Sequence, residues 1–169
     1  VATRALRQRD CSAAAVAAVL GLLAAIVYSC VPQETSHELD VYWMLPRFEA
    51  GVLGYPRHPL FFPVAHALAG LFEGFGTMHD RLKIVSAVAS GVAIGFFVHA
   101  AWLLRRDLRS AVAAGMLYAA LPATVRFATV MEVHGLFLAF AAAVLWQVSR
   151  MVSSPERVGW LAGPWTGGL

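Results

Sequence analysis

The residues best suited to chemistry lie in one short segment, His37-Glu38-Leu39-Asp40-Val41-Tyr42-Trp43. Asp40 can act as a general base or as an electrostatic partner of a phosphate group, with Glu38 assisting it. Side chains two residues apart share a face only where the backbone is extended, because in a helix they diverge. The other interpretation is a solvated loop whose Tyr and Trp anchor the chain at a membrane interface.

A candidate phosphate-binding element follows at residues 54–63, where Arg57 and His58 stand next to prolines. Proline fixes its own φ and biases the preceding residue toward extended backbone, so the two side chains are held in a stiff bend. Guanidinium groups bind phosphate through paired hydrogen bonds. We therefore expect Arg57 and His58, together with His37, to bind a phosphate-bearing substrate. Alternatively, the prolines only shape a helix start and Arg57 meets lipid headgroups.

Glu132, between two apolar segments, is a third candidate for catalysis. An acidic residue at membrane depth is a functional candidate by default, since its burial is costly. The start of a helix also favours a carboxylate through the helix dipole. Helix capping is therefore the competing interpretation of Glu132.

The residue spacing indicates neither a metal site nor a disulfide. Cys11 and Cys30 would lie about 28 Å apart along one helix, beyond the reach of a disulfide. The alternative is a divalent cation that His66 or His79 holds together with Glu38 or Asp40, although no metal-ligand spacing supports such a site. We therefore assign no metal ligand and no cofactor from the residues alone.

The amino-acid composition indicates which class of protein carries these residues. The 169 residues are 59% hydrophobic and 14% charged, with a mean hydropathy of +0.66. Soluble domains are about 45–50% apolar and about 25% charged, and disordered chains are still more polar. Both classes are therefore excluded. The net charge is +3 without a basic run interleaved with aromatics, so we expect membrane lipid rather than nucleic acid as a partner.

Four apolar segments predict an all-α membrane protein with four spans, at residues 12–32, 84–104, 111–130 and 133–151. Each is close to the roughly 20 residues that a helix needs to cross a bilayer. Residues 33–83 form an external loop with a short interfacial or re-entrant helix at 60–75. The first segment is long for a signal peptide, and we expect it to be retained. Within the second, the pattern Gly91-Val-Ala-Ile-Gly95 is typical of helix packing, and His99 is expected to bond a neighbouring helix.

The basic residues decide between four and five spans, because they gather at the cytoplasmic ends of helices. Four spans place eight Lys and Arg residues inside (4, 7, 9, 105, 106, 109, 150, 157) and five outside (47, 57, 81, 83, 126), whereas five spans leave six inside and seven outside. We therefore predict four spans, a cytoplasmic tail at residues 1–11 and a cytoplasmic segment from residue 152. Residues 152–169 also begin a further apolar segment, and we expect the protein to continue. Both acid-bearing loops then meet at the external face.

The order of these features resembles the N-terminal part of the GT-C glycosyltransferase superfamily, particularly its protein O-mannosyltransferase-like members and their bacterial relatives. The likeness covers about residues 10–150. It rests on the acidic segment after the first span and on several short motifs that follow in order: His58-Pro59-Leu60-Phe61-Phe62, Arg81 before Ser86-Ala87, the arginines after the second span, Leu121-Pro122, and Glu132-Val133-His134-Gly135-Leu136.

The resemblance implies transfer of a sugar from a polyprenyl-phosphate carrier to a protein or glycan acceptor at the external face of a bacterial plasma membrane. The family's catalytic acid in the first external loop corresponds to Asp40, with Glu38 as a second possibility, and its second external acid corresponds to Glu132. Members usually have eight or more spans, so we expect this chain to be an N-terminal portion that is inactive alone. The competing class is a non-enzymatic membrane protein, either a transporter fragment or an assembly subunit. Transporters tend to place acids within spans or at broken helices, whereas here the acids concentrate in loops.

Overall fold

The computed structural model describes residues 2–31, 39–52, 60–130 and 133–153, with side chains from residue 10 in the first helix, 43 in the second and 134 in the last. All elements in these ranges are helices, as predicted. They are α1 (Ala2–Cys30), α2 (Leu39–Glu49), α3 (Phe61–Gly70), α4 (Met78–Arg105), α5 (Leu108–Ala120), α6 (Pro122–Thr129) and α7 (Val133–Ser153). Helices suit an apolar chain because each satisfies its own backbone hydrogen bonds.

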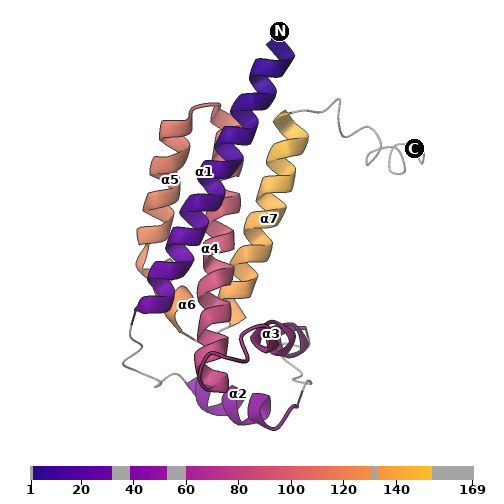
Figure 1. The fold of residues 1–169 in the computed structure, drawn as a ribbon, viewed down its shortest axis with the longest axis vertical. Coiled ribbons are helices and arrows are strands. Elements are labelled where there is room, and N and C mark those ends of the chain that lie inside the picture. The colour runs from indigo at the N-terminus through magenta and orange to yellow at the C-terminus, as the bar shows by residue number, and fades with distance from the viewer. Residues whose placement is uncertain (1, 32–38, 53–59, 131–132, 154–169) are drawn as a thin grey trace, which may run out of the picture.

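The long helices form an up-and-down bundle around α4, and α2 and α3 lie crosswise at one end of it (Figure 1). We call this end, which also holds α6 and the starts of α4 and α7, the platform end. The N-terminus of α1 lies at the opposite end, together with the C-termini of α4 and α7 (Figure 1). We call that the arginine end, after Arg105, Arg106, Arg109 and Arg150. These four arginines, which the charge pattern assigned to one side of the membrane, therefore lie at one end of the bundle.

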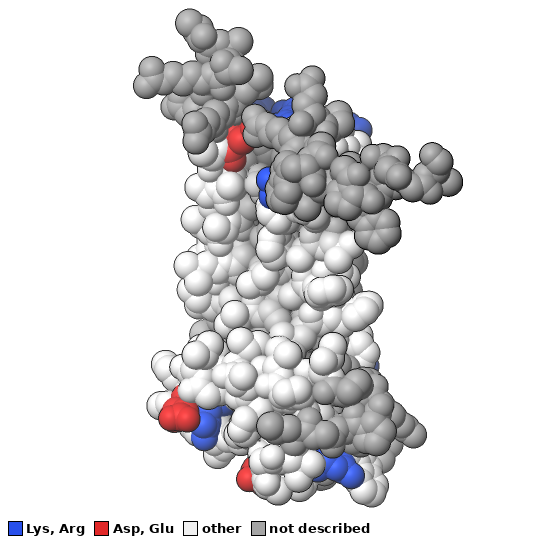
Figure 2. All heavy atoms as spheres, turned by 90° about the vertical axis from the view of Figure 1, so that its right-hand side faces the viewer, with Lys and Arg blue, Asp and Glu red and all other residues white. Residues whose placement is uncertain are grey.

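Three helices are long and apolar enough to cross a membrane: Asp10–Cys30, Met78–Arg105 and His134–Ser153. A fourth crossing results if α5 and α6 count as one span, although the two helices are bent by 64°. Charged side chains gather at the two ends of the face in Figure 2, with an uncharged band between them. These observations indicate a membrane protein with three to four spans.

The third apolar segment, predicted as one helix over 111–130, is broken at Leu121. This residue has φ −60° and ψ 132°, an extended conformation that the following proline favours. Pro122 then begins α6, where its missing N–H would have no helical acceptor in any case. The break is therefore a local consequence of the Leu-Pro step.

The segment predicted as an external loop contains a helix that the sequence did not predict. The interfacial helix expected at 60–75 is confined to Phe61–Gly70, and α2 occupies part of the segment interpreted as loop. The second span begins at Met78 rather than at residue 84, because Thr77 and Asp80 form a capping box. The Asp80 backbone N–H donates to Thr77 Oγ1 (3.3 Å), and the Thr77 backbone N–H donates to Asp80 Oδ2 (2.9 Å). Such reciprocal bonds satisfy amides that the first helical turn leaves open.

Glycines bring α1 and α4 together at their crossing. A Cβ on Gly95 would lie 3.2 Å from the Ala17 carbonyl oxygen, and Gly21 lies against Gly91. The predicted packing role of Gly91 and Gly95 is therefore confirmed. On α5, the Ala119 carbonyl accepts a 2.6 Å hydrogen bond from the Tyr28 hydroxyl, which ties α1 to the same bundle.

Candidate functional site

A hydrophobic cluster holds the platform end together. Its buried members are Met44, Phe48, Phe61, Phe62, Ala65, Ala69, Leu82, Val85 and Val130. Phe48 of α2 stacks on Phe62 of α3, with ring centroids 4.4 Å apart and planes within 9°. Phe48 also meets Phe61 edge-on at 5.8 Å. Aromatic pairs of this kind contribute about 0.5–1.5 kcal/mol beyond the area they bury, so α2 is firmly attached to α3. We call these nine residues the platform cluster.

The platform cluster anchors the described neighbours of all three predicted site segments. Met44 lies one helical turn after Asp40 on α2. Phe61 follows the segment that carries Arg57 and His58, and Val130 comes two positions before Glu132. Segments that are far apart in the sequence therefore attach to one hydrophobic centre.

Of the predicted site residues, only the backbone of Asp40 is described. It lies in the first turn of α2. From the sequence, Glu38 and Asp40 are expected to share a face only if the backbone there is extended. At Asp40 the backbone is helical instead. The Asp40 side chain and five whole residues lie outside the described part of the chain: His37, Glu38, Arg57, His58 and Glu132.

Histidines at the platform end form no metal site in the described part of the chain. No group of three His, Cys, Asp or Glu side chains there could hold an ion. His66 Nδ1 and His79 Nε2 are buried without a hydrogen-bond partner, as is Arg81 Nε. A cation site that also uses Glu38 or Asp40 would involve side chains that lie outside the described part of the chain. Cys11 and Cys30 are free, exposed cysteines on α1.

A hollow with a volume of about 510 Å³ opens where α6 meets α7. Its lining comprises Pro122, Ala123, Arg126, Phe127 and His134. The Phe127 and His134 rings stack with centroids 4.5 Å apart, and Arg126 is exposed. A guanidinium group can bind a carboxylate or a phosphate through paired hydrogen bonds. We call this feature the α6–α7 hollow.

Sequence reasoning did not assign Arg126 and Phe127 to a site. Arg126 entered only the charge count, and His134 only the motif after Glu132. The local signal for them is weak, because the hollow is lined by residues of two separate helices, α6 and α7. The Leu121-Pro122 step, which starts α6, is the one pattern that points to it.

Lys83 ties the platform end of α4 to the end of α1. Its Nζ donates a 2.7 Å hydrogen bond to the Val31 carbonyl oxygen. That carbonyl follows the last turn of α1, where backbone oxygens have no helical donor. Lys83 therefore fixes the point at which the chain leaves α1 toward the predicted acidic segment.

In the part of the chain that the structure describes, the protein is all-helical, and its three to four candidate spans indicate a membrane protein. Comparison of the chain with protein-family models, curated proteins and solved structures finds no match.

Proposed function

We propose that the chain belongs to a glycosyltransferase that moves a sugar from a polyprenyl-phosphate donor to an acceptor hydroxyl at the external membrane face. The observation that supports this best is the platform cluster, which anchors the neighbours of Asp40, of Arg57 and of Glu132. A membrane-surface reaction on a lipid-linked donor needs carboxylate and cationic groups beside the bilayer. The platform end carries the exposed side chains of Glu49 and Arg126, besides the crosswise helices α2 and α3 (Figure 1) and the α6–α7 hollow.

In the proposed reaction, Asp40 removes the proton from the acceptor hydroxyl as its oxygen attacks the anomeric carbon of the sugar. The bond between that carbon and the phosphate oxygen breaks, and the lipid phosphate leaves with the bonding electrons. Arg57 stabilises the negative charge on the departing phosphate, with His37 and His58 as further phosphate ligands. Glu38 and Glu132 complete the acidic side of the site. The acceptor is a protein or a glycan.

The test is transfer activity of the chain in vesicles, expressed with the native sequence that flanks it. Radiolabelled polyprenyl-phosphate mannose is the donor probe, and membrane protein and glycan fractions are the acceptors. Asp40→Asn should lower turnover by about 10²–10⁴-fold, the usual contribution of a general base. Glu49→Gln removes an exposed carboxylate from the same helix and should retain activity. Wild-type turnover in Asp40→Asn would refute the assignment.

A transporter is the second candidate, favoured by the broken α5–α6 pair with its 64° bend. Transporters commonly form substrate sites at interrupted helices. The same vesicles distinguish the two functions. A transporter would move an unmodified substrate across the bilayer, whereas a transferase leaves a covalently labelled acceptor on one side.

A further inference from the structure

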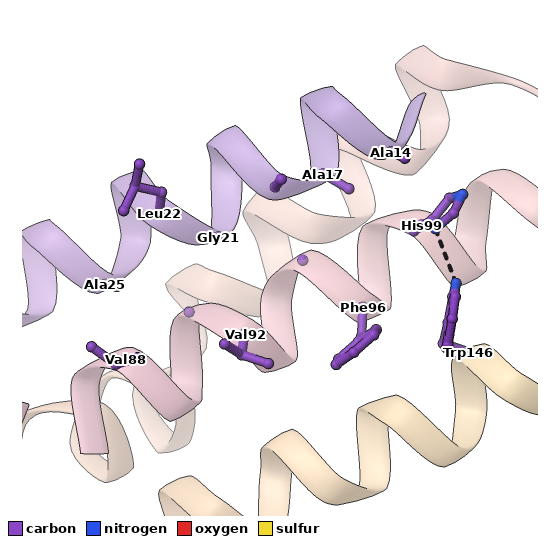
Figure 3. Close-up of a pocket in the computed structure, with 13 residues that line it drawn as sticks. Ala14, Ala17, Gly21, Leu22, Ala25, Val88, Val92, Phe96, His99 and Trp146 are labelled. Carbon is purple, nitrogen blue, oxygen red and sulfur yellow. Dashed lines mark hydrogen bonds between the residues drawn. The ribbon is translucent and has the colours of Figure 1, made fainter. Parts of the chain in front are cut away.

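An apolar groove runs between α1 and α7, with α4 as its floor (Figure 3). Its volume is about 410 Å³. Small residues of α1 form one wall, Ala18 and Gly21 among them, and Val88 and Val92 of α4 contribute exposed side chains. All three helices are candidate membrane spans. The groove therefore lies in the apolar band, where hydrocarbon is the surrounding solvent.

The groove ends in a polar, aromatic belt toward the arginine end. Trp146 Nε1 donates to His99 Nδ1 at 2.9 Å, which confirms the expected bond between His99 and a neighbouring helix. The Arg150 guanidinium lies over the Trp146 ring, 4.9 Å from its centroid. Trp and Arg are typical of the level at which lipid headgroups meet hydrocarbon. The groove thus runs from a hydrocarbon environment to a headgroup environment.

Arg106, also at the arginine end, already has a carboxylate partner in Asp10. Arg106 Nη1 lies 2.6 Å from Asp10 Oδ1, and the same oxygen accepts a 3.3 Å bond from Trp102 Nε1. Arg150 is exposed at the end of α7, and no carboxylate among the described residues lies within ion-pair distance of it. Its cationic charge therefore faces the headgroup level beside the groove.

We propose that the groove binds a hydrocarbon chain of an anionic phospholipid, with the headgroup at Arg150. Basic side chains beside a cleft between spans are the recognised pattern for anionic lipid binding. A second copy of the chain fits less well. Copies related by an axis along the membrane normal would bring their arginine ends together and oppose like charges. This lipid lies at the end opposite the proposed transfer site and is independent of that reaction.

The test is native mass spectrometry of the purified chain in detergent, with phosphatidylglycerol and phosphatidylcholine as competing probes. We expect phosphatidylglycerol to be retained in preference. Arg150→Gln should reduce that preference about fivefold, the effect of one basic residue at an anionic surface. Arg105→Gln removes another exposed arginine from the same end and should leave the preference largely unchanged.

Filling the groove tests where the hydrocarbon chain lies. Ala18 is exposed and lines the groove, so Ala18→Phe should lower retention of both lipids. Ala141→Phe makes the same change at an exposed site of α7 outside the lining and should not. Circular dichroism establishes that each variant is helical. Undiminished lipid retention in Ala18→Phe, equal retention of the two lipids, or a dimer that Ala18→Phe dissociates would each overturn the proposal.

Discussion

Gly21 of α1 and Gly91 of α4 lie backbone against backbone, so that a Cβ added to Gly21 would be 2.6 Å from the Gly91 carbonyl oxygen. Membrane helices use small residues in this way because close backbone approach maximises van der Waals contact where no hydrophobic effect drives association. The Gly21–Gly91 contact therefore sets the spacing of α1 and α4, and with it the floor of the lipid groove.

Gly21→Ala should destabilise the bundle by about 1–3 kcal/mol, the usual cost of overpacking. The added methyl meets backbone rather than a movable side chain, so the helices must separate. Thermal unfolding in detergent measures the effect. Gly70→Ala is the control, because a Cβ there meets nothing within 4 Å. Equal stability of the two variants would contradict the close approach.

Phe48→Ala should weaken the attachment of α2 to the bundle by about 3–5 kcal/mol, as for other large core aromatics. The ring is 1% exposed and contacts both Phe61 and Phe62. Limited proteolysis of the intact protein should then cut near α2 before the long helices. Leu71→Ala, at a side chain 75% exposed, should leave the wild-type cleavage pattern. Protection of α2 in Phe48→Ala would show that the platform cluster is not its anchor.

The predicted topology places the platform end outside the cell and the arginine end in the cytoplasm. In a background with Cys11 and Cys30 changed to Ala, Ala50→Cys should react with an impermeant maleimide in intact cells. Arg109→Cys should react only after the membrane is permeabilised. Both positions are exposed, so reactivity reports the side of the membrane. The reverse pattern would invert the topology and remove the support for external transfer.

Asp107 makes the start of α5 sensitive to acid. Its carboxylate accepts hydrogen bonds from the side chain and backbone N–H of Ser110, and these hold the pKa of Asp107 below its usual value. Because the folded pKa is the lower one, the ionised group stabilises α5 above the unfolded pKa of about 3.9. That stabilisation is lost as the pH falls through the folded pKa. Asp107→Asn should therefore flatten the dependence of melting temperature on pH in the acidic range. An unchanged pH profile would exclude this role.

Local patterns predicted much of the fold because they act within one segment. High mean hydropathy predicted the helices α1, α4 and α7. It does so because the free energies of transferring single residues into hydrocarbon sum along a span, whatever the rest of the fold. The early start of α4 also has a local cause, the Thr77–Asp80 capping box, and so does the break at Leu121-Pro122. The helix α2 was harder to predict, because it contains Pro46 and its 11 residues are too few for a membrane span.

Composition and hydropathy sufficed to predict an apolar, helical protein whose few charges fall between apolar segments. The sequence also supplied the candidates Asp40, Arg57 and Glu132, because residue type and spacing are local properties. The tertiary structure was needed to show that the segments beside these candidates attach to one cluster around Phe48 and Phe62. It alone placed Arg126 beside His134 and formed the groove between α1 and α7. Such features depend on contacts between residues distant in sequence, and the free energy of those contacts exists only once the helices have packed.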